Sequence, residues 1–159
     1  MRVSDAGKRL IKDFEGVHRR PYLCPAILWT VGVGRVLYPE QAKLKIPERK
    51  TYPLKPEHDI QWSDQQIDLL FDADLLRFES SVLRLCPASF ASQGQFDGLV
   101  AFAFNCGPGA LQASTLRRLY NAGDIEGAAA EFPKWNKGGG RILPGLTRRR
   151  LEEQALFLS

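Results

Sequence analysis

The sequence predicts an α+β protein with one small sheet near its N-terminus and a mainly helical second half. Apolar residues recur at helical spacing in several segments, whereas apolar and small or polar residues alternate through 29–34. The 159 residues are enough for one well-buried core and few for two independent domains, so we expect a single domain over 1–159.

The composition is that of an ordinary globular protein, with 44% hydrophobic and 25% charged residues. No apolar run approaches the roughly 20 residues of a membrane-spanning helix. The charged N-terminus lacks the apolar centre of a signal peptide, so we expect a soluble protein made in the cytoplasm. The three cysteines show no CxxC spacing, and neither a metal site nor a cofactor is indicated.

The net charge of +4 is unevenly distributed. Acidic residues cluster between positions 57 and 79, and basic residues between 134 and 150. This asymmetry suggests a polyanionic partner, for which nucleic acid, an anionic membrane and the bacterial cell wall all qualify. A solvated helix face explains the pattern equally well.

The first predicted helix covers residues 4–15, and a second, longer one covers 63–86. Ser63 and Gln66 have the spacing of a capping box at the start of the longer helix. Its expected buried stripe is Ile67, Phe71, Leu75, Phe78, Val82 and Leu85. The four prolines of segment 38–62 predict irregular surface chain, suited to an insertion or a mobile lid.

The stretch 21–38 predicts a hairpin or a three-stranded sheet, with a turn at Pro25-Ala26. In a regular strand, Thr30, Gly32 and Gly34 would share one face. The second half predicts four more helices, at 92–103, 114–121, 125–132 and 147–157. The glycine-rich stretch 135–145 is expected to be a loop, and the last helix to carry Leu151, Ala155 and Leu158 on one face.

Three residues near the predicted sheet could carry chemistry. Glu15 ends the first helix, where the helix dipole disfavours a negative charge. Cys24 and Thr30 can point toward the same space within a hairpin. Each also has an alternative without a chemical role. Glu15 would be an exposed glutamate at a helix end, Cys24 a half-buried small hydrophobic residue, and the stretch with Thr30 an edge strand.

These residues also carry a resemblance. The spacing Glu-x8-Cys-x5-Thr, running into Thr-x-Gly-x-Gly, resembles the catalytic signature of phage-type lysozymes, glycoside hydrolase family 24. The family usually has Asp, less often Cys, at the middle position. Three later stretches also resemble family motifs, in the same order: Ala103-Phe104-Asn105-Cys106-Gly107, Ser114-Thr115-Leu116, and WNKGGGRILPG at 135–145 followed by LTRRR.

The resemblance implies a two-lobed lysozyme-like fold. Residues 16–62 would form a small β-containing lobe, and 1–15 with 63–159 a helical lobe reached through the long connecting helix. The implied activity is hydrolysis of the β-1,4 bond between N-acetylmuramic acid and N-acetylglucosamine in peptidoglycan, with inversion. Glu15 would be the general acid, and Cys24 and Thr30 would position the water.

The resemblance also implies further site residues. Val36, Phe104, Asn105 and Thr115 would bind the substrate. An arginine of the last helix would pair with the catalytic glutamate, and we favour Arg149. Residues 149 and 150 project about 100° apart on a helix, so only one of them can take that role.

The sequence departs from the family pattern at three positions. Cys24 is not a carboxylate, so the two-carboxylate scheme of inverting enzymes is not literally available. Two roles are then possible for Cys24. Its thiolate could act as the base, or Cys24 could only help Thr30 to hold the water. We prefer the second role. Ile27 replaces a glycine, which puts the family's turn in doubt, and Arg35 replaces a histidine and could pair with an acid of the long helix.

Other functions remain open at this point. A lytic transglycosylase on the same fold needs only the one acid, although Thr30 argues against it. A non-catalytic peptidoglycan-binding module would suit a basic face, although an intact Glu15 argues against that. A cysteine hydrolase using Cys24 with His18 or His58 is the weakest alternative.

The resemblance also sets the expected surroundings of the protein. The partner would be bacterial peptidoglycan, with no nucleic acid, no stable membrane insertion, no cofactor and no metal. The protein would be a monomer that stays in the host cytoplasm until lysis. It would then reach the periplasm and cell wall through membrane lesions made by a holin.

Overall fold

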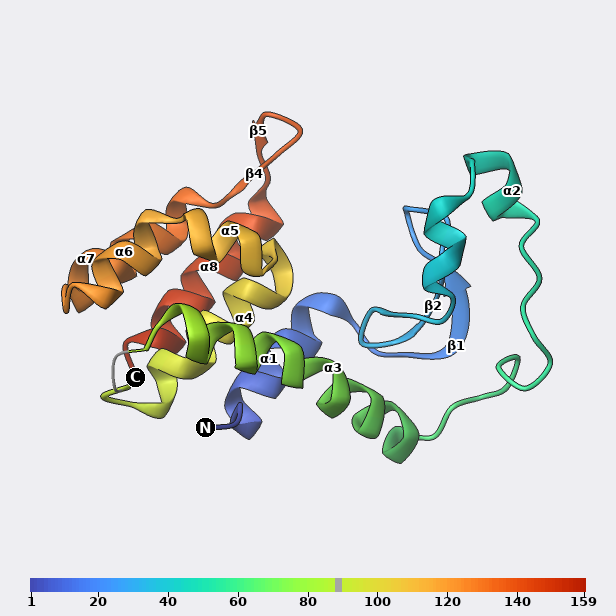
Figure 1. Cartoon of the computed structure of the whole chain (residues 1–159), viewed down its shortest axis with the longest axis horizontal. Coiled ribbons are helices and arrows are strands. Elements are labelled where there is room, and N and C mark those ends of the chain that lie inside the picture. The colour runs from blue at the N-terminus through green and yellow to red at the C-terminus, as the bar shows by residue number, and fades with distance from the viewer. Residues whose placement is uncertain (88–89) are drawn as a thin grey trace. The chain divides into compact units, whose positions relative to one another are not determined.

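The computed structural model describes residues 1–87 and 90–159 (Figure 1). Contacts within the chain divide it into two compact units. The helical unit consists of Met1–Phe14 with Leu75–Ser159, and the sheet unit of Glu15–Asp74. The expected α+β class, with small antiparallel sheets and a mainly helical C-terminal part, is confirmed.

The sheet unit contains three antiparallel strands in the order β1 (His18–Leu23), β2 (Trp29–Gly32) and β3 (Arg35–Val36). The expected shared face of Thr30, Gly32 and Gly34 is wrong at Gly34, which lies in the turn between β2 and β3. Gly32 is the last residue of β2, and Gly32 and Gly34 have φ of +64° and +76°. Only glycine adopts this backbone without strain, which explains both positions.

The proline-rich segment is more regular than expected. It forms η1 (Pro39–Lys43) and α2 (Ile46–Lys50), each with a proline in its first two positions. Proline is tolerated there because the amide hydrogen it lacks would have had no partner within the helix. Gln41 is completely buried, so the segment is anchored to the sheet unit.

Helix α3 (Asp64–Leu85) starts in the sheet unit and ends in the helical unit. The predicted capping box is confirmed, since the Ser63 amide donates to Gln66 Oε1 at 2.8 Å and the Gln66 amide to Ser63 Oγ at 3.2 Å. The predicted stripe is also buried, at Ile67, Phe71, Leu75, Phe78, Val82 and Leu85.

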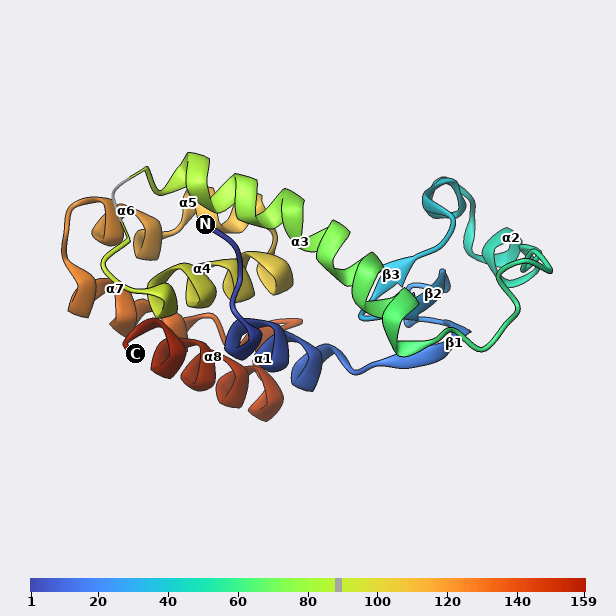
Figure 2. The same ribbon diagram turned by 90° about the horizontal axis from the view of Figure 1, so that it is seen from below.

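The helical unit is built around α4 (Gln93–Cys106), which is buried from Gly94 to Ala103. It packs against α8 (Pro144–Phe157), as Figure 2 shows. A Cβ atom on Gly98 would lie 2.7 Å from the Cβ atom of Phe157, so glycine allows this close approach. The other elements of the unit are α1 (Asp5–Glu15, through Phe14), α5 (Pro108–Ala113), α6 (Thr115–Asn121), α7 (Ile125–Glu131) and η2 (Phe132–Lys134).

One expectation for the C-terminal part was wrong. The stretch 135–145 was expected to be a loop, but it contains a hairpin of β4 (Lys137–Gly138) and β5 (Arg141–Ile142). Helix α8 leaves the face with Leu151, Ala155 and Leu158 exposed. It buries Arg149, Arg150, Glu153 and Phe157 instead, because the charged members of this set bind one another.

Candidate active site

The turn between β1 and β2 carries Cys24. The Cys24 amide donates to the Leu28 carbonyl at 3.0 Å, and the Ile27 amide donates to the Cys24 carbonyl at 2.7 Å. Ile27 has a φ of +57°, in the left-handed region that a β-branched residue rarely adopts. The turn therefore keeps a backbone that suits glycine, and the isoleucine makes it strained.

Tyr22, Thr30 and Val36 form a row across the three strands. Thr30 is paired with Tyr22 on β1 and with Val36 on β3. Directly opposite residues project from the same face of a sheet. Thr30 is 2% exposed, and its hydroxyl donates to the Leu28 carbonyl at 2.9 Å, which holds this hydroxyl beside the Cys24 turn.

Cys24 is a half-buried free thiol with an altered acidity. Partial burial raises the pKa of Cys24, but hydrogen bonds outweigh this effect. They come from the Thr30 hydroxyl and from the backbone at Leu28, Ala26 and Cys24 itself, so the pKa lies below its ordinary value. A lowered pKa increases the thiolate fraction near neutral pH.

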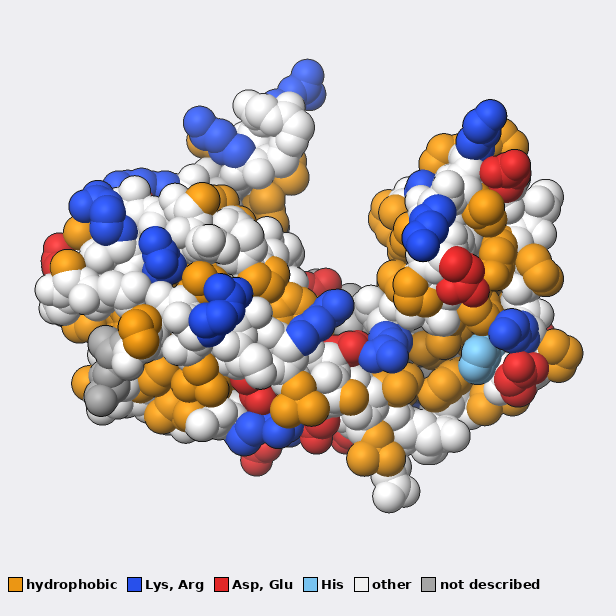
Figure 3. Space-filling model, viewed as in Figure 1, with side chains coloured by type: hydrophobic (Ala, Val, Ile, Leu, Met, Phe, Trp, Pro, Cys, Tyr) orange, Lys and Arg blue, Asp and Glu red, His pale blue; other side chains and the backbone are white. Residues whose placement is uncertain are grey.

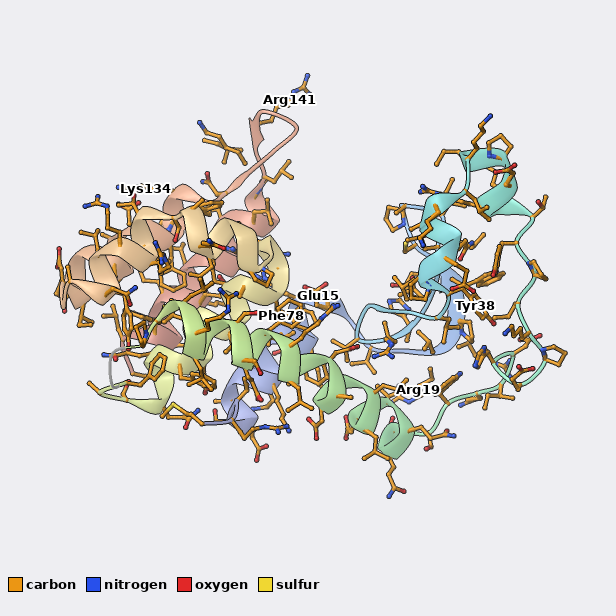
Figure 4. The ribbon with its side chains drawn as sticks, in the orientation of Figure 1. Glu15, Arg19, Tyr38, Phe78, Lys134 and Arg141 are labelled. Atoms are coloured by element: carbon orange, nitrogen blue, oxygen red, sulfur yellow. The ribbon has the colours of Figure 1, made fainter. Side chains whose placement is uncertain are left out.

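Glu15 and Tyr22 belong to the same group of residues. Glu15 is half-buried at the end of α1 (Figure 4) and is followed by Gly16 with φ of +78°. The pKa of Tyr22 is raised by burial and further by the negative charges of Cys24 and Glu15. Glu15 and Cys24 therefore both act electrostatically on Tyr22, a residue that the sequence reasoning did not select.

A buried clamp fixes the Cys24 turn from behind. Gln41 accepts a hydrogen bond from the Trp29 amide at 2.9 Å and donates to the carbonyls of Ile27 at 3.2 Å and Arg49 at 3.0 Å. The Arg49 guanidinium donates to the Ala26 carbonyl at 3.2 Å. The proline-rich segment therefore positions the turn, a role that no motif in the sequence indicated.

The predicted substrate-binding residues of the helical unit lie on two helices. Phe104 and Asn105 are at the C-terminal end of α4, and Thr115 is the first residue of α6. Phe104 and Asn105 line a pocket of about 490 Å³ inside this unit. Its other lining residues are Arg77, Phe78, Ser81, Cys106, Gly107 and Pro108.

The two buried arginines of α8 share one carboxylate. Glu153 Oε1 accepts from Arg149 Nε at 2.9 Å and from Arg150 Nη2 at 3.0 Å. The Arg149 guanidinium lies 5.4 Å from the centre of the Phe14 ring. Arg150 instead donates to Asn105 Oδ1 at 2.7 Å, so it supports the end of α4, a role that sequence reasoning missed.

Basic side chains gather on the surface of the helical unit near the hairpin (Figures 3 and 4). Lys134, Lys137, Arg141 and Arg148 are all exposed. Within 1–87 and 90–159, no group of His, Cys, Asp and Glu side chains could hold a metal ion. No helix in those same ranges has the length and apolar character needed to cross a membrane.

Comparison with known proteins identifies the family. Residues 12–153 match the model of the phage lysozyme family. The chain belongs to this family. The endolysin of Acyrthosiphon pisum secondary endosymbiont phage 1 is 34% identical over 171 residues, covering 100% of this chain and 99% of that protein.

Other relatives are longer. The endolysin of Bacillus phage B103 is 38% identical over 164 residues, but the chain spans only 55% of its length. The same holds for the endolysin of Bacillus phage PZA, of which 56% is covered. The chain therefore spans little more than half the length of these two phage lysozyme relatives.

Two solved structures share the fold of this chain. The muramidase domain of SpmX from Asticaccaulis excentricus has a TM-score of 0.79 at 30% identity, covering 99% of this chain and 98% of that one. The endolysin from Escherichia coli O157:H7 phage FAHEc1 has a TM-score of 0.80 at 28% identity, covering 100% and 94%.

Proposed function

We propose that this chain is an endolysin that hydrolyses the β-1,4 bond between N-acetylmuramic acid and N-acetylglucosamine in bacterial peptidoglycan. One observation carries the proposal. In a chain of the phage lysozyme family, the Thr30 hydroxyl is fixed beside the Cys24 turn by its bond to the Leu28 carbonyl, and the charges of Cys24 and Glu15 both raise the pKa of Tyr22.

Glu15 is the general acid in this proposal. It protonates the glycosidic oxygen while water attacks the anomeric carbon of the muramic acid from the opposite face, which inverts the configuration. Thr30 and Cys24 hold that water. The bond from Thr30 to the Leu28 carbonyl supports this role because it fixes the hydroxyl beside the Cys24 turn.

Each unit supplies candidate substrate-binding residues. In the sheet unit we assign Val36 to glycan binding, because it shares a row with Thr30. In the helical unit we assign Phe104, Asn105 and Thr115, as the family resemblance implies. Phe104 and Asn105 are supported by the pocket that they line.

Arg149 is the arginine that we assign to the catalytic glutamate, as the family resemblance implies. Two observations support this assignment. Arg149 is 4% exposed and anchored by Glu153, and its guanidinium stacks on Phe14, the residue before Glu15. The neighbouring Arg150 is committed to Asn105 and Cys106.

We place the protein in the host cytoplasm, as a monomer, until a holin opens the membrane and gives it access to the wall. The basic surface near the β4–β5 hairpin then favours approach to the anionic wall. The phage relatives named endolysins support this setting.

Glu15→Gln is the direct test, with Glu57→Gln as the matched control because Glu57 is an exposed glutamate of the same unit. We expect Glu15→Gln to abolish clearing of permeabilised Gram-negative cells, and Glu57→Gln to keep it. Full activity of Glu15→Gln would refute the assignment. Mass spectrometry of the released fragments distinguishes hydrolysis from transglycosylation, because anhydromuramic ends would exclude a hydrolase.

A further inference from the structure

The buried side chain of Gln41 holds the backbone on both sides of Leu28. Gln41 belongs to η1, in the segment that follows β3 (Figure 1), and it is completely buried. Its Nε2 donates to the Ile27 carbonyl at 3.2 Å, and its Oε1 accepts from the Trp29 amide at 2.9 Å. Nε2 also donates to the Arg49 carbonyl at 3.0 Å, so both ends of the amide have partners and its orientation is fixed.

Each of the contacts beside Leu28 fixes a whole peptide group, because a peptide group is planar and trans. The first group joins the Ile27 carbonyl to the Leu28 amide, and the second joins the Leu28 carbonyl to the Trp29 amide. In a trans peptide the N–H and the C=O point in opposite directions. Gln41 therefore holds one end of each group and leaves the Leu28 amide and the Leu28 carbonyl directed away from it.

The other ends of these peptide groups act on the two residues that the proposed function assigns to the water. The Leu28 carbonyl accepts from the Thr30 hydroxyl at 2.9 Å and from the Cys24 amide at 3.0 Å. Burial raises the pKa of the Cys24 thiol, but hydrogen bonds, including those with the Thr30 hydroxyl and the Leu28 backbone, lower it below its ordinary value. One buried amide is thus linked through Leu28 to a hydroxyl and to a thiol.

The same contacts hold a strained residue. Ile27 has a φ of +57°, which a β-branched residue rarely adopts. Gln41 holds the carbonyl of Ile27, and the Arg49 guanidinium donates to the Ala26 carbonyl at 3.2 Å. Strain of this kind persists only where the surrounding structure maintains it. The clamp therefore opposes relaxation of the turn, which would rotate the adjoining peptide groups.

We propose that Gln41 is a positioning residue of the reaction, which aligns Thr30 and Cys24 for the attacking water through the two peptide groups of Leu28. This proposal rests on the proposed function, because it concerns the water that Thr30 and Cys24 hold. Gln41 is completely buried, so it acts on the reaction only through the backbone. The proline-rich segment, which carries no catalytic motif, thereby becomes part of the catalytic apparatus.

Gln41→Met tests the proposal, because methionine keeps the length of the side chain and removes its amide. Gln65→Met is the matched control, since Gln65 is an exposed glutamine of the same unit. On soluble peptidoglycan fragments we expect Gln41→Met to lower kcat about tenfold and to leave KM unchanged, because a misplaced water affects the reaction step and not the binding of glycan. Gln65→Met should match the wild type. A wild-type kcat for Gln41→Met would overturn the proposal.

The acidity of Cys24 gives a readout that a merely structural role would not move. It is measured as the pH dependence of alkylation by iodoacetamide, with the modified cysteine identified by mass spectrometry. We expect Gln41→Met to raise the pKa of Cys24 toward its ordinary value, because the Leu28 backbone no longer stabilises the thiolate. An unchanged pKa would overturn the proposal. Inactivity of the wild type on peptidoglycan would instead refute the proposed function, and the alkylation would still decide whether Gln41 controls Cys24.

Gln41→Met is also combined with Ile27→Gly, because glycine relaxes the strained turn and offsets the loss of stability. Ile27→Gly alone should keep the wild-type kcat. In the double variant we expect Tm to rise above that of Gln41→Met, while kcat stays about tenfold low. Recovery of kcat together with Tm would overturn the proposal, because Gln41 would then serve stability alone. Failure of the double variant to fold would overturn it as well, since Gln41 would then be a requirement of the fold.

Discussion

Glu153→Gln should destabilise the protein more than any exposed charge substitution on α8. Glu153 is completely buried, and its Oε1 accepts from Arg149 at 2.9 Å and Arg150 at 3.0 Å. Removing one partner of a buried ion pair costs about 3–5 kcal/mol, because the remaining charge stays in the interior. Glutamine keeps one carbonyl acceptor, so we expect the lower end, about 3 kcal/mol.

For a chain of 159 residues, 1 kcal/mol corresponds to about 2–4 °C in Tm, so the expected fall is about 6–12 °C. Circular dichroism during heating and urea unfolding measure it. Glu152→Gln is the control, because the Arg148–Glu152 pair is 3.4 Å apart with side chains 68% and 48% exposed. It should cost less than about 0.5 kcal/mol. Similar values for the two variants would refute the idea that Glu153 neutralises a buried cluster.

Two further predictions concern the cysteines. Cys24→Ser should lower the lytic rate only about tenfold, because serine can still help Thr30 hold the water, and the ratio of wild-type to variant rate should not change with pH. A ratio that grows as pH rises through the lowered pKa of Cys24 would make the thiolate the base. Burial raises the pKa of Cys86 to about 11 from 9.0, so the unfolded chain loses this proton first and stability should fall between pH 9 and pH 11. Urea unfolding across this range should show a shallower fall for Cys86→Ala, and an identical slope would contradict the assignment.

Periodicity and capping residues sufficed to predict much of the fold. The stripe of α3 from Ile67 to Leu85 is buried as expected, and Ser63 and Ser92 cap their helices. These features are local, so a single sequence contains the information. The suggested pairing of Arg35 with an acid of the long helix is also confirmed, and this acid is Asp74 on α3.

The errors arose where distant contacts decide the outcome. Helix α8 buries Arg149, Arg150 and Glu153, because they neutralise one another and hold the end of α4. A rule that places apolar residues inside cannot anticipate such a cluster. Gly34 was assigned to a strand face because an alternating pattern carries no information on the sign of φ.

The candidate site was predicted in part. The sequence motif selected Glu15, Cys24 and Thr30, and the structure groups Cys24 with Thr30 and both Cys24 and Glu15 with Tyr22. Tyr22 was missed because its place opposite Thr30 depends on the strand register, which shifts between His18 and Tyr22. Gln41 was missed because its three partners lie 8 to 14 residues away in an irregular segment.

The Gln41 clamp has a practical consequence for anyone who modifies this protein. Residues 41–49 look like a dispensable surface loop, but an affinity tag or fluorophore placed there would disturb the backbone of the Cys24 turn through Gln41 and Arg49. Glu57 is exposed and lies beyond Arg49, so its side chain offers a safer attachment point.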